Sequence, residues 1–145
     1  DILKKYKWKK TAIEDELVNH PCISLNAFMC ICAIQNLNIV FIDDRKIYTL
    51  ISNIENISNN LHIIQKIENK FSLFMGTHEE NYNKYIKGIS ELWHINNLHK
   101  PLRGISSYKA KDLQDICKKL QLEILNDNKR KKSKKILYQM IQEHL

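Results

Sequence analysis

The middle of the chain contains two pairs of short apolar runs, and each pair is joined by a very short polar stretch. The first pair, residues 38–42 and 46–51, is separated by Asp43 and Asp44 with the following arginine. The second pair, residues 61–67 and 70–75, is separated by the dipeptide Glu68-Asn69. Apolar and β-branched runs joined by a short polar turn predict β-hairpins. For the second pair, a helix over 61–68 is the competing interpretation.

Helical spacing of apolar residues flanks these runs on both sides. Residues 2–19 predict one amphipathic helix or two short ones, ended by Pro21. Ser24 is a good N-cap for a helix through about Gln35, and this helix is apolar almost all round, so we expect it to be buried. Residues 79–93 predict a further helix, with this apolar face: Tyr82, Tyr85, Ile86, Ile89, Leu92 and Trp93.

These elements predict an α+β fold, in which a small antiparallel sheet of two hairpins packs with helices and a C-terminal two-helix module follows. Pro101 and Gly104 make residues 96–104 the best candidate linker, between a core domain over 1–100 and a module over 105–145. A content of 43% hydrophobic and 27% charged residues is typical of globular chains. No apolar run is long enough to span a membrane, so we expect no membrane partner.

The C-terminal module reads as two amphipathic helices. Ser106 or Ser107 is the expected cap of a helix over 108–122, and Ser133 of a second helix. The first apolar stripe comprises Tyr108, Leu113, Ile116, Cys117 and Leu120, and the second comprises Ile136, Leu137, Met140, Ile141 and Leu145. We expect the centres of the two stripes to form a mutual core, namely Leu113, Leu120, Leu137 and Ile141.

Positive charge is concentrated in the same module. Residues 101–145 contain 11 Lys+Arg against 5 Asp+Glu, which accounts for +6 of the chain's net +7. A localised basic surface of this kind favours nucleic acid as the partner. Lysines dominate it, and their ammonium groups suit phosphates better than base edges, so we expect binding that is largely independent of sequence.

The segment 105–145 resembles the SAP-type helix-extension-helix DNA-binding motif. The first helix matches through Tyr108, Lys109, Asp112 and Leu113, and the second, more loosely, through Lys134 and Leu137. The chain lacks the family's usual glycine before the lysine and has a longer loop. The resemblance implies DNA contact through the inter-helix loop and the start of the second helix. The implied contact residues are Lys109, Lys129, Arg130, Lys131, Lys132, Ser133, Lys134 and Lys135.

The composition also carries an indication of origin. Isoleucine (22), lysine (20) and asparagine (15) dominate while arginine occurs three times, a bias that an AT-rich genome imposes. With this bias and the SAP-like module, the chain resembles proteins of large nucleocytoplasmic DNA viruses. That resemblance implies a location in the host cytoplasm, the nucleus or the virion. The four cysteines are too few and too uneven for a disulfide scaffold, so we expect free thiols in a reducing intracellular compartment. The start at Asp1 rather than Met suggests a processed or excised piece.

Other clusters of reactive or polar side chains have simpler readings. Five lysines interleave with Tyr6 and Trp8 in residues 4–10, a pattern that fits base stacking or, more simply, a helix that buries its aromatics. His20 and three nearby cysteines could bind zinc, but Cys30 and Cys32 lie two apart on a helix and face different ways. No nucleophile context or glycine-rich phosphate loop is present, so we expect no catalytic residue, cofactor or metal.

The sequence therefore predicts a non-enzymatic protein that binds DNA or RNA through phosphates. The alternative is a structural or assembly protein, such as a component of a virus particle or transcription complex, whose C-terminal helix pair docks another protein. A degenerate enzyme fold is the third possibility.

Overall fold

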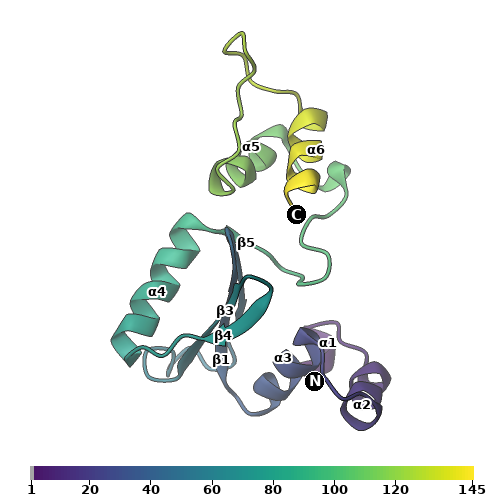
Figure 1. The fold of residues 1–145 in the computed structure, drawn as a ribbon, viewed down its shortest axis with the longest axis vertical. Coiled ribbons are helices and arrows are strands. Elements are labelled where there is room, and N and C mark those ends of the chain that lie inside the picture. Colours follow the sequence, from purple (N-terminus) through teal and green to yellow (C-terminus); the bar gives the residue numbers. More distant parts are fainter. Residues whose placement is uncertain (1) are drawn as a thin grey trace. The chain divides into compact units, whose positions relative to one another are not determined.

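The computed structural model describes residues 2–145, and it is an α+β fold, as predicted (Figure 1). Its sheet has five strands in the order β4-β3-β1-β2-β5. The strands are β1 (Asn38–Asp43), β2 (Lys46–Leu50), β3 (Leu61–Ile67), β4 (Lys70–Leu73) and β5 (Trp93–His94). The helices are α1 (Ile2–Lys5), α2 (Lys10–Asn19), α3 (Leu25–Ile34), α4 (His78–Glu91), α5 (Ala110–Lys119) and α6 (Lys134–His144), with a 3-10 helix η1 (Ile105–Ser107).

The second hairpin forms as strands, so the helical interpretation of residues 61–68 is wrong. β3 and β4 pair antiparallel, with Ile64 opposite Leu73 and Ile67 opposite Lys70. Glu68 and Asn69 both have positive φ, at 48° and 62°. This is the conformation that a two-residue type I′ turn requires, and its twist matches that of the flanking strands. β4 ends at Leu73, two residues before the predicted end of the run.

The sheet is mostly antiparallel, as predicted, and a fifth strand that was not predicted adds one parallel pair. β5 pairs parallel with β2, with Trp93 in register with Lys46. The backbone N–H of Trp93 donates to the Arg45 carbonyl at 2.9 Å, and that of Ile95 donates to the Ile47 carbonyl at 2.9 Å. Trp93 therefore leaves the helix face predicted over 79–93, and α4 ends at Glu91. A two-residue strand has no periodicity that could be read from the sequence.

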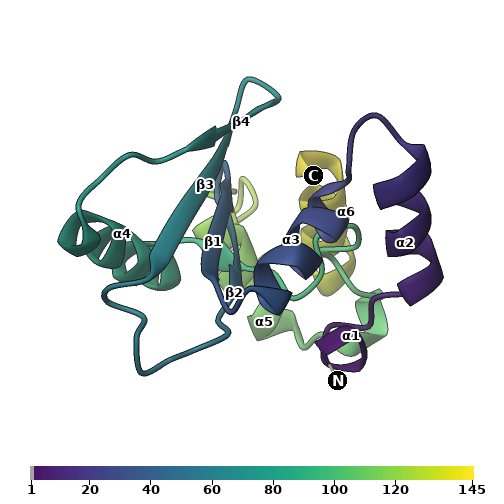
Figure 2. The ribbon, with the colours of Figure 1, turned by 90° about the horizontal axis from the view of Figure 1, so that it is seen from below.

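Helix α3 packs against α1 and α2, and its start is the predicted one. The Ser24 hydroxyl accepts a hydrogen bond from the N–H of Ala27 at 3.2 Å, which confirms the N-cap. Strands β1 and β3 lie between α3 and α4, so the sheet has a helix on each face (Figure 2). Burial of α3 is nevertheless incomplete, because Ile31 and Ile34 are exposed, the latter at 58%. The prediction that this helix is buried all round is wrong for those two side chains.

The N-terminal stretch forms two short helices, one of the two predicted alternatives, and α2 ends at Asn19, before Pro21. Ile13 of α2 forms a small core cluster with Ala27 and Cys30 of α3. Among residues 2–145, no helix has the length and hydropathy to cross a membrane.

The chain divides into two compact units. The first comprises Asp1–Ile42 and Thr49–Ile86, and the second comprises Asp43–Tyr48 and Lys87–Leu145. The second unit, which we call the C-terminal unit, contains the basic module. Within it, Arg45 donates through Nε to the Lys119 carbonyl at 2.9 Å and through Nη2 to the Glu91 carbonyl at 3.4 Å. Its guanidinium thus lies at the C-terminal ends of α5 and α4, where the helix dipole favours a cation.

Candidate nucleic-acid interface

Helices α5 and α6 pack against each other and support the basic segment between them. Leu113, Leu137 and Ile141 are each 0% exposed, and Leu120 is 3% exposed. The predicted burial of these four side chains is therefore confirmed, and the two helices that carry them are in contact. Ile136 is an exception within the second predicted stripe, because it is 48% exposed.

The start of α5 differs from the prediction. Ser106 and Ser107 belong to η1, and the N-cap residue is Lys109. The Lys109 backbone N–H donates to the Asp112 carboxylate at 2.7 Å, so Asp112 satisfies a free donor at the helix start. Lys109 itself is exposed, but it lies at the opposite end of α5 from the one that the basic segment follows.

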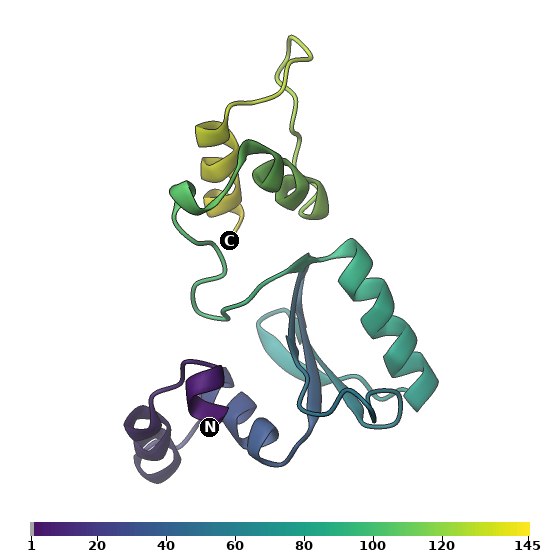
Figure 3. The same ribbon diagram turned by 180° about the vertical axis from the view of Figure 1, so that it is seen from behind.

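The segment between the helices is an ordered hairpin rather than the predicted loop, and it projects away from the helix pair (Figure 1, Figure 3). Leu125 and Lys131 form an isolated antiparallel bridge. Asn126 closes the tip, where its N–H donates to the Arg130 carbonyl at 2.8 Å and its side-chain oxygen accepts from the Arg130 N–H at 2.8 Å. We call residues 120–133 the basic hairpin. Its cations are therefore attached to a backbone that is already folded.

Helix α6 begins at the base of the basic hairpin. The Ser133 hydroxyl accepts a hydrogen bond from the Ile136 N–H at 3.4 Å, which confirms the predicted cap. Lys134 and Lys135 occupy the first turn, and this turn contains no acidic residue. Free backbone N–H groups and the positive end of the helix dipole already favour an anion here. Two ammonium groups at the same end strengthen that preference.

The implied contact residues differ in how free they are. Lys129, Arg130, Lys131, Ser133 and Lys135 are exposed, whereas Lys132 and Lys134 are half-buried. The Lys132 ammonium donates to the Glu123 carbonyl at 2.9 Å across the basic hairpin. Lys132 therefore holds the hairpin together and has less freedom than its neighbours to meet a phosphate.

Sequence reasoning missed the residues that shape this site. Gln121, with φ of 60°, lies just after the C-cap of α5, and the following Leu122 N–H donates to the Cys117 carbonyl at 2.8 Å, as in a Schellman motif. A glycine would normally mark such an end, and Gln121 gives no such signal. The Asn-Asp-Asn run at 126–128 did carry a turn signal, but not the information that Leu125 and Lys131 would pair across it.

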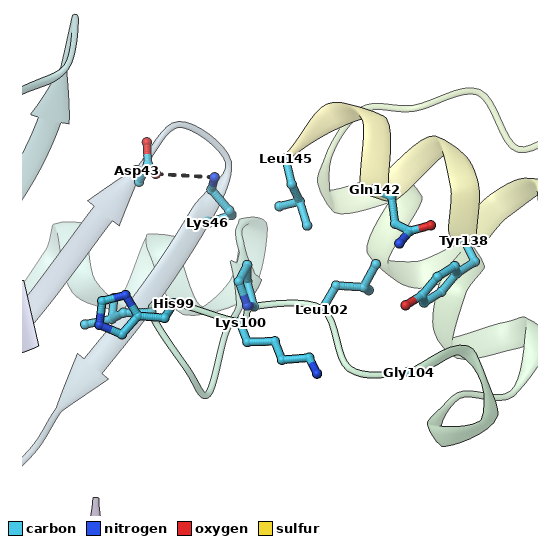
Figure 4. Close-up of a pocket in the computed structure, with 11 residues that line it drawn as sticks. Asp43, Lys46, His99, Lys100, Leu102, Gly104, Tyr138, Gln142 and Leu145 are labelled. Atoms are coloured by element: carbon cyan, nitrogen blue, oxygen red, sulfur yellow. Dashed lines mark ion pairs between the residues drawn. The ribbon is translucent and has the colours of Figure 1, made fainter. Parts of the chain in front are cut away.

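A cavity of about 680 Å³, open to solvent, lies in the same unit between residues 98–104, Lys46 and the end of α6 (Figure 4). Lys46 pairs with Asp43 at 3.3 Å. The Tyr138 hydroxyl donates to the Arg103 carbonyl at 3.0 Å. Lys46, Asp43 and Tyr138 thus already have partners, and we assign no ligand to the cavity.

Among residues 2–145, no group of three or more His, Cys, Asp or Glu side chains is placed to hold a metal ion. All four cysteines are free: Cys22 is exposed, and Cys30, Cys32 and Cys117 are buried. Burial raises the pKa of these three buried thiols, and for Cys117 the nearby Lys132 ammonium offsets part of the rise.

We expect an alkylating reagent to label Cys22 alone in the folded protein and all four cysteines in denaturant. The reagent attacks an accessible thiolate, and in the folded protein the other three thiols are buried. Intact mass measured against time counts the labels, and Cys22→Ser should remove the fast one. Burial raises the pKa of these three thiols above the ordinary value of 9.0, so the unfolded chain loses their protons at a lower pH than the folded protein does. The free energy of unfolding should therefore fall as the pH rises past about 9. Rapid labelling of a second cysteine in the folded protein would contradict this arrangement.

No family model, curated protein or solved structure matches the chain. The resemblance of residues 105–145 to the SAP-type motif, and the viral origin, therefore stay predictions.

Proposed function

We propose that the protein binds nucleic acid, foremost duplex DNA, by contacting phosphates through the basic hairpin and the first turn of α6. The observation that carries this proposal is the density of charge on an ordered support. Residues 126–135 contain six Lys+Arg and one Asp, and they extend from the bridged hairpin into the capped start of a helix.

Order in the hairpin matters for affinity. A disordered lysine tail must lose conformational entropy when it binds. In the basic hairpin, the hydrogen bond from the Arg130 N–H to the Asn126 side chain and that from the Lys132 ammonium to the Glu123 carbonyl already fix the backbone. The free cations are mostly lysines, which neutralise phosphates as point charges and give little bidentate base readout. Binding should therefore depend strongly on salt and weakly on sequence.

Titration of the full chain with duplex DNA at several salt concentrations tests the proposal. If about four phosphates are neutralised, affinity should fall roughly a hundredfold between about 50 and about 200 mM salt. A random and a defined duplex of the same length should give similar curves. A flat salt profile, or no binding at low salt, would refute the proposal.

Replacement of four lysines of the basic hairpin and the first turn of α6 locates the contact. The variant carries Gln at Lys129, Lys131, Lys134 and Lys135 and retains Lys132, because Lys132 holds the hairpin. We expect at least a tenfold loss of duplex affinity at low salt and a flatter salt slope. The control removes the same charge elsewhere, with Gln at Lys66, Lys70, Lys84 and Lys87. Equal losses in the two variants would show that net charge, rather than the basic hairpin, drives binding.

A second candidate, docking of another protein in an assembly, is favoured by apolar exposure outside the basic hairpin. Strand β4 lies at an edge of the sheet, and all four of its residues are exposed. Its Phe71 and Leu73 are 60% and 52% exposed. Edge strands of this kind pair readily with another chain. Salt separates the candidates, because apolar docking does not weaken steeply as salt rises.

A further inference from the structure

Tyr6 and Trp8, near the N-terminus, form a stacked aromatic pair. Their ring centroids are 4.8 Å apart and their planes differ by 24°. They lie in the short turn between α1 and α2 (Figure 2), within a run of seven residues that contains five lysines and no acidic residue. This turn is separate from the basic hairpin in sequence and belongs to the other compact unit.

The backbone between the two rings explains the stack. Side chains two apart on a helix face different ways, but α1 ends before Tyr6 and Lys7 has a φ of 57°. The Trp8 N–H then donates to the Leu3 carbonyl at 2.9 Å and the Lys7 N–H to the Lys4 carbonyl at 3.2 Å. This reversal brings both rings together, although a lysine in this conformation is disfavoured relative to glycine.

Trp8 anchors the pair to the core of this unit, and the Tyr6 ring stacks on Trp8. Trp8 packs against the cluster of Ile13, Ala27 and Cys30, while both rings stay half-buried rather than buried. The ammonium of Lys5 lies 5.0 Å from the centroid of the Tyr6 ring. The pair is therefore a supported aromatic platform with a cation beside it.

The lysines around this platform are available to a polyanion. All five, at positions 4, 5, 7, 9 and 10, are exposed. Lys10 pairs with Glu14 at 3.5 Å, an exposed pair that water and salt weaken. Among residues 2–145, Lys4, Lys7 and Lys9 take part in no ion pair.

We propose that this turn, the Tyr6–Trp8 platform, binds single-stranded nucleic acid. One unpaired base stacks on Tyr6 and continues the Tyr6–Trp8 stack, and the surrounding lysines contact the flanking phosphates. A stacked base contributes roughly five- to 150-fold in affinity, whereas an exposed cation–π contact contributes roughly two- to fivefold. A base therefore displaces the Lys5 ammonium from the ring. Bases inside a duplex are already stacked on each other, so the site selects single strands.

The first test uses the intrinsic fluorescence of the full chain with an oligo(dT) single strand of about ten nucleotides. Stacking on the pair should quench tryptophan emission at Trp8. The other tryptophan, Trp93, is 7% exposed and should stay unaffected. Trp8→Phe should abolish the quenching. Absence of quenching in the unmodified protein at low salt overturns the proposal.

The second test removes the platform's outer ring. Tyr6→Leu should weaken oligo(dT) binding by roughly five- to 150-fold and change duplex affinity by less than about twofold. Tyr85→Leu is the matched control, because Tyr85 is also half-buried beside another aromatic ring, Tyr82, but the two are tilted by 50°. Equal effects of the two variants, or equal losses for single strand and duplex, overturn the proposal. Thermal melting checks folding, and if Tyr6→Leu unfolds the protein, the quenching measurement decides alone.

Single-strand binding at the Tyr6–Trp8 platform can be measured separately from duplex binding at the basic hairpin. The variant with Gln at Lys129, Lys131, Lys134 and Lys135 should keep its quenching by oligo(dT), even where its duplex affinity is lost. Loss of quenching in that variant would show that the single strand binds at the basic hairpin instead, which overturns the N-terminal site.

Discussion

Leu137→Ala is expected to lower the free energy of unfolding of the C-terminal unit by about 2–5 kcal/mol. Leu137 of α6 is 0% exposed, and so is Leu113 of α5, the helix that α6 packs against. Cys117 of α5 contacts the backbone of Leu137, with its sulfur 3.9 Å from the Leu137 carbonyl oxygen. Truncation removes apolar burial and leaves a cavity that neighbours on two rigid helices fill poorly.

Urea unfolding followed by Trp93 emission measures this loss, because Trp93 belongs to the same compact unit. Ile136→Ala is the matched control, since Ile136 precedes Leu137 in α6 but is 48% exposed. Its effect should stay within about 0.5 kcal/mol. Similar losses from the two variants would show that α5 and α6 do not share a tight core.

Asn38→Ala is expected to destabilise the protein by about 2–3 kcal/mol through lost hydrogen bonds. Asn38 is 0% exposed at the start of β1. Its side-chain oxygen accepts from the N–H groups of Ser52 and Asn53 at 2.9 and 3.0 Å, and its amide donates to the Asn53 carbonyl at 2.8 Å. Alanine leaves all three backbone groups without this partner. Because Asn53 is near the surface, water can replace part of the loss.

Hydrogen exchange gives this prediction a local readout, because the amides of Ser52 and Asn53 should exchange faster in Asn38→Ala. Asn59→Ala is the control, since Asn59 is an exposed asparagine in the loop that Asn38 holds. Asn38→Asp sharpens the test further. A carboxylate can accept both N–H groups but cannot donate to the Asn53 carbonyl. If Ser52 and Asn53 stay protected in Asn38→Ala, the side chain does not organise this loop.

Features set by close sequence neighbours could be predicted. Ser24 and Ser133 cap their helices as expected, because an N-cap bond reaches only three residues along the chain. The hairpin at Glu68-Asn69 formed for a similar reason, since a two-residue turn between apolar runs leaves little choice of pairing. The buried centres of α5 and α6 followed from helical periodicity, which places residues three and four apart on one face.

Contacts between distant residues were decided by the tertiary structure alone. Strand β5 exists because the Trp93 N–H finds the Arg45 carbonyl, and no local pattern marks a two-residue strand. The charge of the basic hairpin was visible in the sequence. The sequence did not show that the Lys132 ammonium donates to the Glu123 carbonyl while Lys131 remains exposed. A lysine's identity sets its charge, but only the folded backbone determines which carbonyl lies within its reach.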